Sequence, residues 1–199
     1  MESIGVIDMT KIEGLDQLED LVVLILTEND ITEIDGLENL LNLRYLHLNY
    51  NKITEIKGLE QLTNLELLDL DWNRITEING LENLVNLECL YLNHNKIQEI
   101  KGFENLRKLR ELYLNENQIK EIKALDSLEC LESLQLANNQ ITEIKNLENL
   151  KVLKQIDLFN NKIPLEMLNQ CRNLSEKAVL LLEAQKCVAY CKKKSLPNL

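Results

Sequence analysis

Apolar residues recur along the chain in a pattern that repeats every 22 residues. Counted from its first Leu, each copy reads LxxLxLxxNxIxxIxxLxxLxx, and six complete copies start at Leu21, Leu43, Leu65, Leu87, Leu109 and Leu131. A seventh copy starts at Leu153 and breaks at Pro164. A fixed period of this length indicates a solenoid, in which stacking buries the apolar row that one repeat alone would expose.

The two halves of the repeat have different periodicities. Leu at positions 4 and 6 alternates with variable residues, as in a strand with one buried face. Apolar residues at positions 11, 14, 17 and 20 recur every three residues, which favours 3₁₀-like turns. Gly stands at position 16 from Gly14 to Gly102 and indicates a tight turn. We expect parallel strands within residues 23–26, 45–48, 67–70, 89–92, 111–114, 133–136 and 155–158.

Position 9 is Asn in every copy, from Asn29 to Asn161. An inward-pointing amide at the end of a strand needs hydrogen-bond partners, and backbone groups of the adjoining loop can supply them. We therefore predict a buried Asn ladder with a structural role.

The segments NKITEIKGLEQLTNLELLDLDWN and NGLENLVNLECLYLNHN carry a family resemblance. They resemble leucine-rich repeat proteins, specifically the 22-residue class typified by the Sds-type regulatory subunit of protein phosphatase 1. The resemblance implies a curved solenoid with a concave parallel β-sheet, 3₁₀ turns on the convex side, and service as a binding scaffold. Bacterial internalin-type repeats share the period, but they usually carry Pro where this chain has Gly, and they are usually secreted.

Three segments follow from the pattern. Residues 1–20 form a degenerate N-terminal repeat, 21–163 the repeat array, and 164–199 a helical C-terminal cap with a basic tail. Pro164 suits the start of one helix, and Ser175 suits the N-cap of a second that ends near Lys192, Lys193 and Lys194. The second helix would cover the open end of the last repeat; a docking helix for a partner is the alternative.

Composition and charge narrow the functional classes. Hydrophobic residues make up 45% of the chain, enough for a core, and the net charge of −11 disfavours nucleic-acid binding. No apolar run approaches a membrane span, and the N-terminus shows no secretory signal. Five Cys, an odd number, fit a reducing compartment. We expect a cytoplasmic or nuclear protein that is not secreted, without membrane partner or cofactor.

Glu at position 13 and acidic residues at position 18 recur in six copies, from Glu33 to Glu148. Lys follows two residues after four of the position-13 Glu residues. We interpret these rows as a solvated outer surface.

The exposed strand positions 3, 5, 7 and 8 have a different composition. These 28 residues over seven strands include six of the eight aromatic residues of the chain and both His, but no Lys or Arg. We predict that they bind a partner, because interfaces are rich in aromatic residues. Cross-strand aromatic pairs that only stabilise the sheet are the alternative. The candidate contact residues are Tyr45, His47, Tyr50, Asp69, Asp71, Trp72, Tyr91, His94, Tyr113, Glu116, Asp157 and Phe159.

Catalytic and metal sites fit poorly. His47 beside Asp69 resembles a base with its orienting group, but no nucleophile has a determined place beside them. Cys187 and Cys191 share a helix face without the CxxC spacing of a zinc site. We predict neither catalysis nor a metal.

The leading hypothesis is a non-catalytic scaffold that binds a protein with a basic or mixed surface on the concave face. The resemblance implies a narrower version, a regulatory subunit of a phosphatase 1-type enzyme, with contacts at Asp69, Trp72, Tyr91, Tyr113, Asp157 and Phe159. A structural component of a larger assembly, using its ends or its convex face, is the alternative. Self-association through the N-terminal edge is a further expectation.

Overall fold

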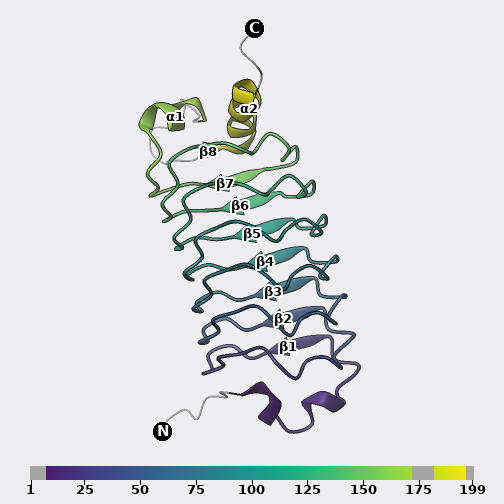
Figure 1. Cartoon of the computed structure of the whole chain (residues 1–199). Coiled ribbons are helices and arrows are strands. Elements are labelled where there is room, and N and C mark those ends of the chain that lie inside the picture. Colours follow the sequence, from purple (N-terminus) through teal and green to yellow (C-terminus); the bar gives the residue numbers. More distant parts are fainter. Residues whose placement is uncertain (1–7, 172–181, 196–199) are drawn as a thin grey trace.

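The computed structural model describes residues 8–171 and 182–195. Its single sheet follows chain order, with seven parallel strands and an eighth, antiparallel one at the C-terminal end (Figure 1). The strands are β1 Val23–Ile25, β2 Tyr45–His47, β3 Leu67–Asp69, β4 Cys89–Tyr91, β5 Glu111–Tyr113, β6 Ser133–Gln135, β7 Gln155–Asp157 and β8 Leu182–Glu183. The seven predicted strands are confirmed, each one residue shorter than expected.

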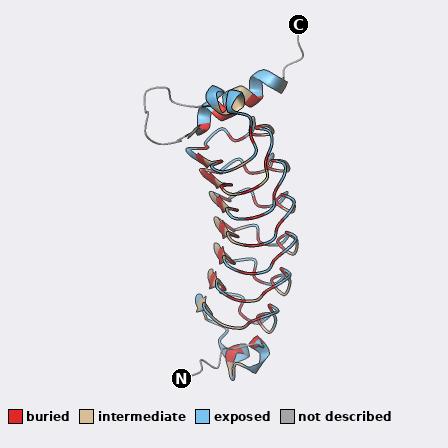
Figure 2. Cartoon of the chain, turned by 90° about the vertical axis from the view of Figure 1, so that its left-hand side faces the viewer, coloured by how far each residue is buried: buried red, intermediate tan, exposed pale blue. Residues whose placement is uncertain are grey.

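Neighbouring strands pair without any shift in repeat position. Leu24 pairs with Leu46, and Leu46 pairs with Leu68, so identical positions stack along the whole array. The Leu residues at positions 4 and 6 point inward and are fully buried in the central copies. Figure 2 shows the strands along the concave side of the stack and the turns along the opposite side.

The turn half of each repeat is built from separate turns closed by i to i+3 backbone hydrogen bonds. Leu40 N–H, for example, donates to Leu37 O at 3.0 Å. Among the described residues, only η1 Met9–Lys11 and η2 Leu15–Gln17 are 3₁₀ helices. The tight turn predicted at position 16 is confirmed, since Gly58 has φ +70°. A Cβ there would lie 2.5 Å from Ile34 O of the preceding repeat.

The predicted Asn ladder is confirmed. Asn95 Oδ1 accepts a hydrogen bond from Ile75 N–H at 2.9 Å, and Nδ2 donates to Leu70 O at 3.0 Å and Leu92 O at 3.2 Å. Each such amide thus joins two successive repeats. The same bonds recur at Asn51, Asn73, Asn117, Asn139 and Asn161.

The C-terminal segment covers the last repeat with two helices, α1 Leu165–Gln170 and α2 Ala184–Ser195. The α2 face formed by Ala184, Cys187, Val188 and Cys191 is buried against the core. One expectation was wrong: Leu182 and Glu183 are not helical but extend the sheet, pairing with Ile156 and Gln155. The N-cap predicted at Ser175 lies outside the described residues.

The N-terminal end is less completely covered. Met9 and Leu15 are buried, but the inward-facing Leu21, Leu24 and Leu26 of the first copy are only partly buried. The first copy therefore leaves part of its inward-facing apolar row uncovered at the N-terminal end.

Candidate functional site

The strand register gathers the exposed residues of the concave face into columns that run along the solenoid. At position 5, His47 pairs with Asp69, Asp69 with Tyr91, and Tyr91 with Tyr113. At position 8, each backbone N–H donates to the position-7 carbonyl of the next repeat, as Trp72 N–H does to Asn93 O at 2.9 Å. Residues of equal repeat position therefore lie side by side in both columns.

The position-8 column has left-handed backbone throughout. All seven of its residues have φ between +52° and +56°, and three of them are the bulky rings of Tyr50, Trp72 and His94. Left-handed backbone costs an L-residue about 1–2 kcal/mol, and Asn tolerates it best among side-chain-bearing residues. Asn138 and Asn160 occupy this position in the last two copies. His is also enriched in this region, so Tyr50 and Trp72 are the two rings whose backbone represents strain that folding alone does not require.

The three rings form one stack. The Tyr50 and Trp72 centroids lie 5.3 Å apart with planes 10° from parallel, and those of Trp72 and His94 lie 3.6 Å apart at 15°. One face of the indole is thus covered closely by His94, and the other is partly covered by the offset ring of Tyr50. Tyr50 and Trp72 are nevertheless 46% and 45% exposed, so the stack presents ring edges to solvent. We call Tyr50, Trp72 and His94 the aromatic ridge.

The position-5 column carries a second, shorter stack. The Tyr91 and Tyr113 rings lie 4.8 Å apart, and Tyr91 Oη donates to Glu111 Oε2 at 2.7 Å. Burial, followed by the hydrogen bond to Glu111, raises the pKa of the Tyr91 phenol well above its ordinary value. His47 Nδ1 lies 3.5 Å from Asp69 Oδ2, an ion pair only when the imidazole is protonated.

Position 7 forms a second polar ladder that the sequence analysis missed. Asn93 donates to both Asp71 oxygens, from N–H at 2.6 Å and from Nδ2 at 2.9 Å. Asn115 N–H then donates to Asn93 Oδ1 at 2.9 Å. Burial raises the pKa of Asp71 despite these bonds. Both carboxylate oxygens of Asp71, a candidate contact residue, therefore already accept hydrogen bonds within the sheet. The sequence signal for this ladder was the recurrence of Asn at repeat position 7, as Asn49, Asn93 and Asn115.

Basic residues line the edge of the concave face at position 2, just before the strands. Arg110 bridges Glu88 at 3.4 Å and Glu132 at 3.1 Å, while Arg44 pairs with Glu66, and Lys154 pairs with Glu132. These charges are largely compensated across neighbouring repeats. The sequence analysis did not predict this row, because pairing between copies depends on side-chain directions.

Three of the candidate residues flank the other nine. Tyr45 Oη donates to Glu66 Oε2 at 3.1 Å near the position-2 edge. At the C-terminal end of the face, Asp157 Oδ1 accepts from Phe159 N–H at 2.8 Å, and Phe159 is 56% exposed. The structure therefore divides the candidate set into a central group and two flanking groups.

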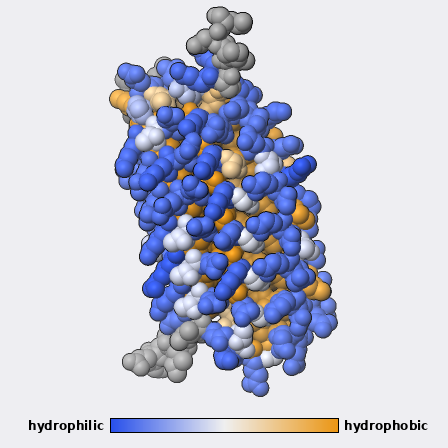
Figure 3. Space-filling model, in the orientation of Figure 1, coloured by the Kyte–Doolittle hydropathy of each residue, from blue (hydrophilic) through white to orange (hydrophobic). Residues whose placement is uncertain are grey.

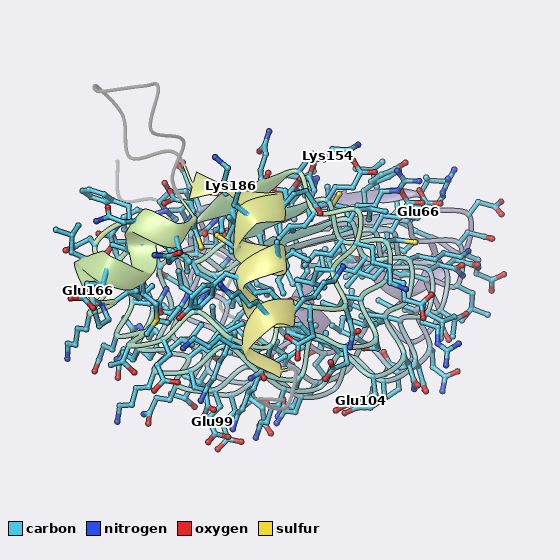
Figure 4. The ribbon with its side chains drawn as sticks, turned by 90° about the horizontal axis from the view of Figure 1, so that it is seen from above. Glu66, Glu99, Glu104, Lys154, Glu166 and Lys186 are labelled. Atoms are coloured by element: carbon cyan, nitrogen blue, oxygen red, sulfur yellow. The ribbon has the colours of Figure 1, made fainter. Side chains whose placement is uncertain are left out.

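The face opposite the sheet is covered largely by hydrophilic side chains (Figure 3). Seen from above, Glu99 and Glu104 lie on this side, whereas Glu66 and Lys154 lie on the strand side (Figure 4). The position-15 Lys residues bind the Glu of the preceding repeat, as in Lys101–Glu77 at 2.7 Å and Lys57–Glu33 at 2.8 Å. The outer rows thus form exposed ion pairs, which contribute little individually.

Within residues 8–171 and 182–195, no three His, Cys, Asp or Glu side chains converge on a point where a metal ion fits. The helices described there include none with the length and apolar character of a membrane span. No cofactor-binding arrangement emerges from the described contacts of the concave face.

Solved structures share this architecture. Internalin C2 of Listeria monocytogenes is 31% identical with a TM-score of 0.73, covering 85% of this chain and 71% of its own. The Toll–Spatzle complex of Drosophila is 25% identical with a TM-score of 0.68, and the match covers 75% of this chain and 23% of that chain. The TLR13–ssRNA13 complex is 34% identical with a TM-score of 0.66, and the match covers 72% of this chain and 23% of that chain. Curated protein sequences gave no match.

A family model described as leucine-rich repeats in two copies matches residues 19–61, 41–83 and 85–127. These matches together span more than half of the 199 residues. They coincide with the copies that stack in register from β1 to β5. The chain therefore belongs to the leucine-rich repeat family.

Proposed function

We propose that this protein is a non-catalytic scaffold that binds a protein partner on its concave strand face. The observation that carries the proposal is the aromatic ridge, whose rings are half-exposed and sit on left-handed backbone. Backbone strain of this kind clusters at functional sites, where function offsets its cost. Stacking across strands recovers part of that cost but does not explain why rings, rather than Asn, occupy these positions.

The charge of the face determines the kind of partner. Positions 3, 5, 7 and 8 of the seven repeats carry no Lys or Arg, whereas Glu28, Asp69, Glu116 and Asp157 are among their acidic residues. Such a face attracts a basic or mixed protein surface. One structural relative was solved with RNA, but a net charge of −11 disfavours a polyanion here.

A narrower version is a regulatory subunit of a phosphatase 1-type enzyme. It rests on the resemblance at Asp69, Trp72, Tyr91, Tyr113, Asp157 and Phe159. The structure supports it only in that all six lie on the same strand face. Co-purification with the phosphatase 1 catalytic subunit, compared between the wild-type chain and Asp69→Lys, tests this version separately.

The test of the broader proposal is an affinity capture with paired variants. Asp69→Lys reverses a charge on the concave face, and Glu77→Lys reverses one on the outer rows. We expect proteins captured by wild type to be lost with the first variant and retained with the second. Loss with Glu77→Lys alone would show that the outer rows are the binding surface.

The captured partner then allows affinities to be measured. We expect Tyr91→Ala and Trp72→Ala each to weaken binding by roughly 2 kcal/mol, about 30-fold in Kd, because central buried aromatics dominate interfaces. Trp72→Ala also removes two stacking contacts, so its melting temperature must be recorded alongside. Unchanged affinity in both variants would contradict the proposal.

A further inference from the structure

We propose that the position-8 column binds an extended peptide segment of the partner that carries one Arg at each end and apolar residues between them. This inference rests on the proposed function and specifies the partner chemistry of the same face. Its elements are the aromatic ridge and the two carboxylates that bracket it, Glu28 and Glu116.

The column is continuous because backbone hydrogen bonds fix every step. Glu28 N–H donates to Asn49 O at 3.0 Å, and Glu116 N–H donates to Ala137 O at 2.9 Å, in the same manner as the ridge residues between them. Both Glu residues share the left-handed backbone, at φ +56°. Five successive position-8 side chains therefore project from equivalent places, in the order acid, three rings, acid.

The middle of the column favours apolar side chains. His94 stacks closely on one face of the Trp72 ring and Tyr50 stacks with an offset on the other, so the indole faces offer a cation less room than the ring edges offer an aliphatic side chain. Ring edges carry the positive part of the aromatic quadrupole and repel a cation. Aliphatic side chains can pack along these edges without an electrostatic penalty.

The two ends of the stack favour Arg. Because the rings stack in the order of the column, the outer face of Tyr50 is on the Glu28 side and the outer face of His94 is on the Glu116 side. Neither carboxylate has a side-chain hydrogen bond or ion pair with the described part of the chain. A guanidinium can stack on an aromatic face and pair with a carboxylate at once, which an ammonium does less well. Each end of the ridge thus offers an aromatic face and a carboxylate to the same guanidinium.

The spacing fixes the length of the segment. Glu28 and Glu116 are four strands apart, about 19 Å at about 4.8 Å per strand. An extended peptide advances about 3.3 Å per residue, so six steps cover about 20 Å. The two Arg residues should therefore be separated by five residues.

The probe is the acetylated and amidated peptide Arg-Thr-Leu-Thr-Val-Thr-Arg, in which both Arg residues and the two apolar residues lie on the same face of the extended chain. Because the chain contains one Trp, in the ridge itself, the intrinsic indole fluorescence reports binding directly. We expect saturable binding at low ionic strength, and weaker binding when Lys replaces both Arg residues. A peptide with Glu in place of Arg, and one with only two residues between the Arg residues, serve as controls that should bind less tightly.

The variants Glu28→Gln and Glu116→Gln test the two ends. Each should raise the Kd of the probe by about two- to fivefold, the range for an exposed ion pair. Glu104→Gln, an exposed carboxylate on the opposite side, is the matched control and should leave the Kd unchanged (Figure 4).

Three results would overturn the inference: no fluorescence response to the probe at millimolar concentration, equal affinity for the acidic peptide, or equal Kd values in the Glu28, Glu116 and Glu104 variants. The proposed function is judged separately, by the response of the captured partner to Asp69→Lys. If the captured partner loses binding to Asp69→Lys but the probe peptide does not bind, the proposed scaffold function stands and only the peptide inference is wrong.

Discussion

The four glycines at Gly14, Gly58, Gly80 and Gly102 offer a graded test of how closely the repeats pack. All have φ between +66° and +81°, so replacement by Ala imposes a similar backbone cost at each. They differ in what a Cβ would meet. At Gly58 and Gly80 it would lie 2.5 Å from a carbonyl oxygen of the preceding repeat, at Gly102 3.3 Å, and at Gly14 nothing lies within 4 Å.

The expected magnitudes follow from two contributions. Left-handed backbone costs Ala about 1–2 kcal/mol, and the reduced freedom of the unfolded chain returns about 0.4–1 kcal/mol, so Gly14→Ala should destabilise by about 1 kcal/mol or less. Gly58→Ala adds an overlap with Ile34 O that the backbone must relieve by about half an ångström. Overpacking of this kind costs about 1–3 kcal/mol. We expect Gly58→Ala and Gly80→Ala to destabilise by about 2 kcal/mol and Gly102→Ala by less.

The assay is urea and thermal unfolding followed by circular dichroism. In a domain of this size, about 2 kcal/mol corresponds to a fall of about 4–8 °C in melting temperature. Ala124, which occupies the same repeat position at φ +54°, provides the reverse change in Ala124→Gly, expected to be close to neutral. Equal melting temperatures for the Gly14 and Gly58 variants would refute the packing argument.

Three further predictions follow from other parts of the structure. Asn95→Leu leaves the buried Ile75 N–H without a partner and removes one of two donors from Leu70 O and from Leu92 O, so it should cost about 2–3 kcal/mol, measured by urea unfolding. Burial raises the pKa of Asp71, so the folded chain binds its proton more readily than the unfolded chain, and stability falls as pH rises through that range. Asp71→Asn should therefore raise the melting temperature at neutral pH, with an advantage that shrinks in acid; a constant advantage would contradict this. Deleting residues 182–199 should uncover Leu153, Ile156 and Leu158 and cause aggregation, detected by light scattering; a monodisperse truncation would show that α2 is not needed as a cap.

The repeat register made the columns predictable. Because no insertion interrupts the 22-residue period, equal positions must lie on adjacent strands, which placed His47 beside Asp69 and Tyr50 beside Trp72. The Asn ladder followed from the same argument. Sequence reasoning therefore located the candidate face and the neighbours of each residue on it.

Local geometry was not predictable in the same way. The residue types at position 8 indicate left-handed backbone only in part, since Asn138, Asn160 and His94 favour it and the Tyr, Trp and Glu residues of the other four copies do not. That conformation brings the rings into a stack and exposes their edges. The strand at Leu182–Glu183 was missed because Leu182 ends a continuous apolar run. The periodicity of such a run cannot separate a short strand from a helix.

The most direct test of concave-face binding uses the single indole of the chain. Trp72 is the only Trp in the sequence, so labelling with 5-fluorotryptophan gives one ¹⁹F NMR resonance from the centre of the proposed interface. Adding a saturating amount of unlabelled partner should shift and broaden that resonance, because binding removes solvent from a side chain that is 45% exposed. A partner that co-elutes with the chain while the resonance stays unchanged would contradict binding on this face.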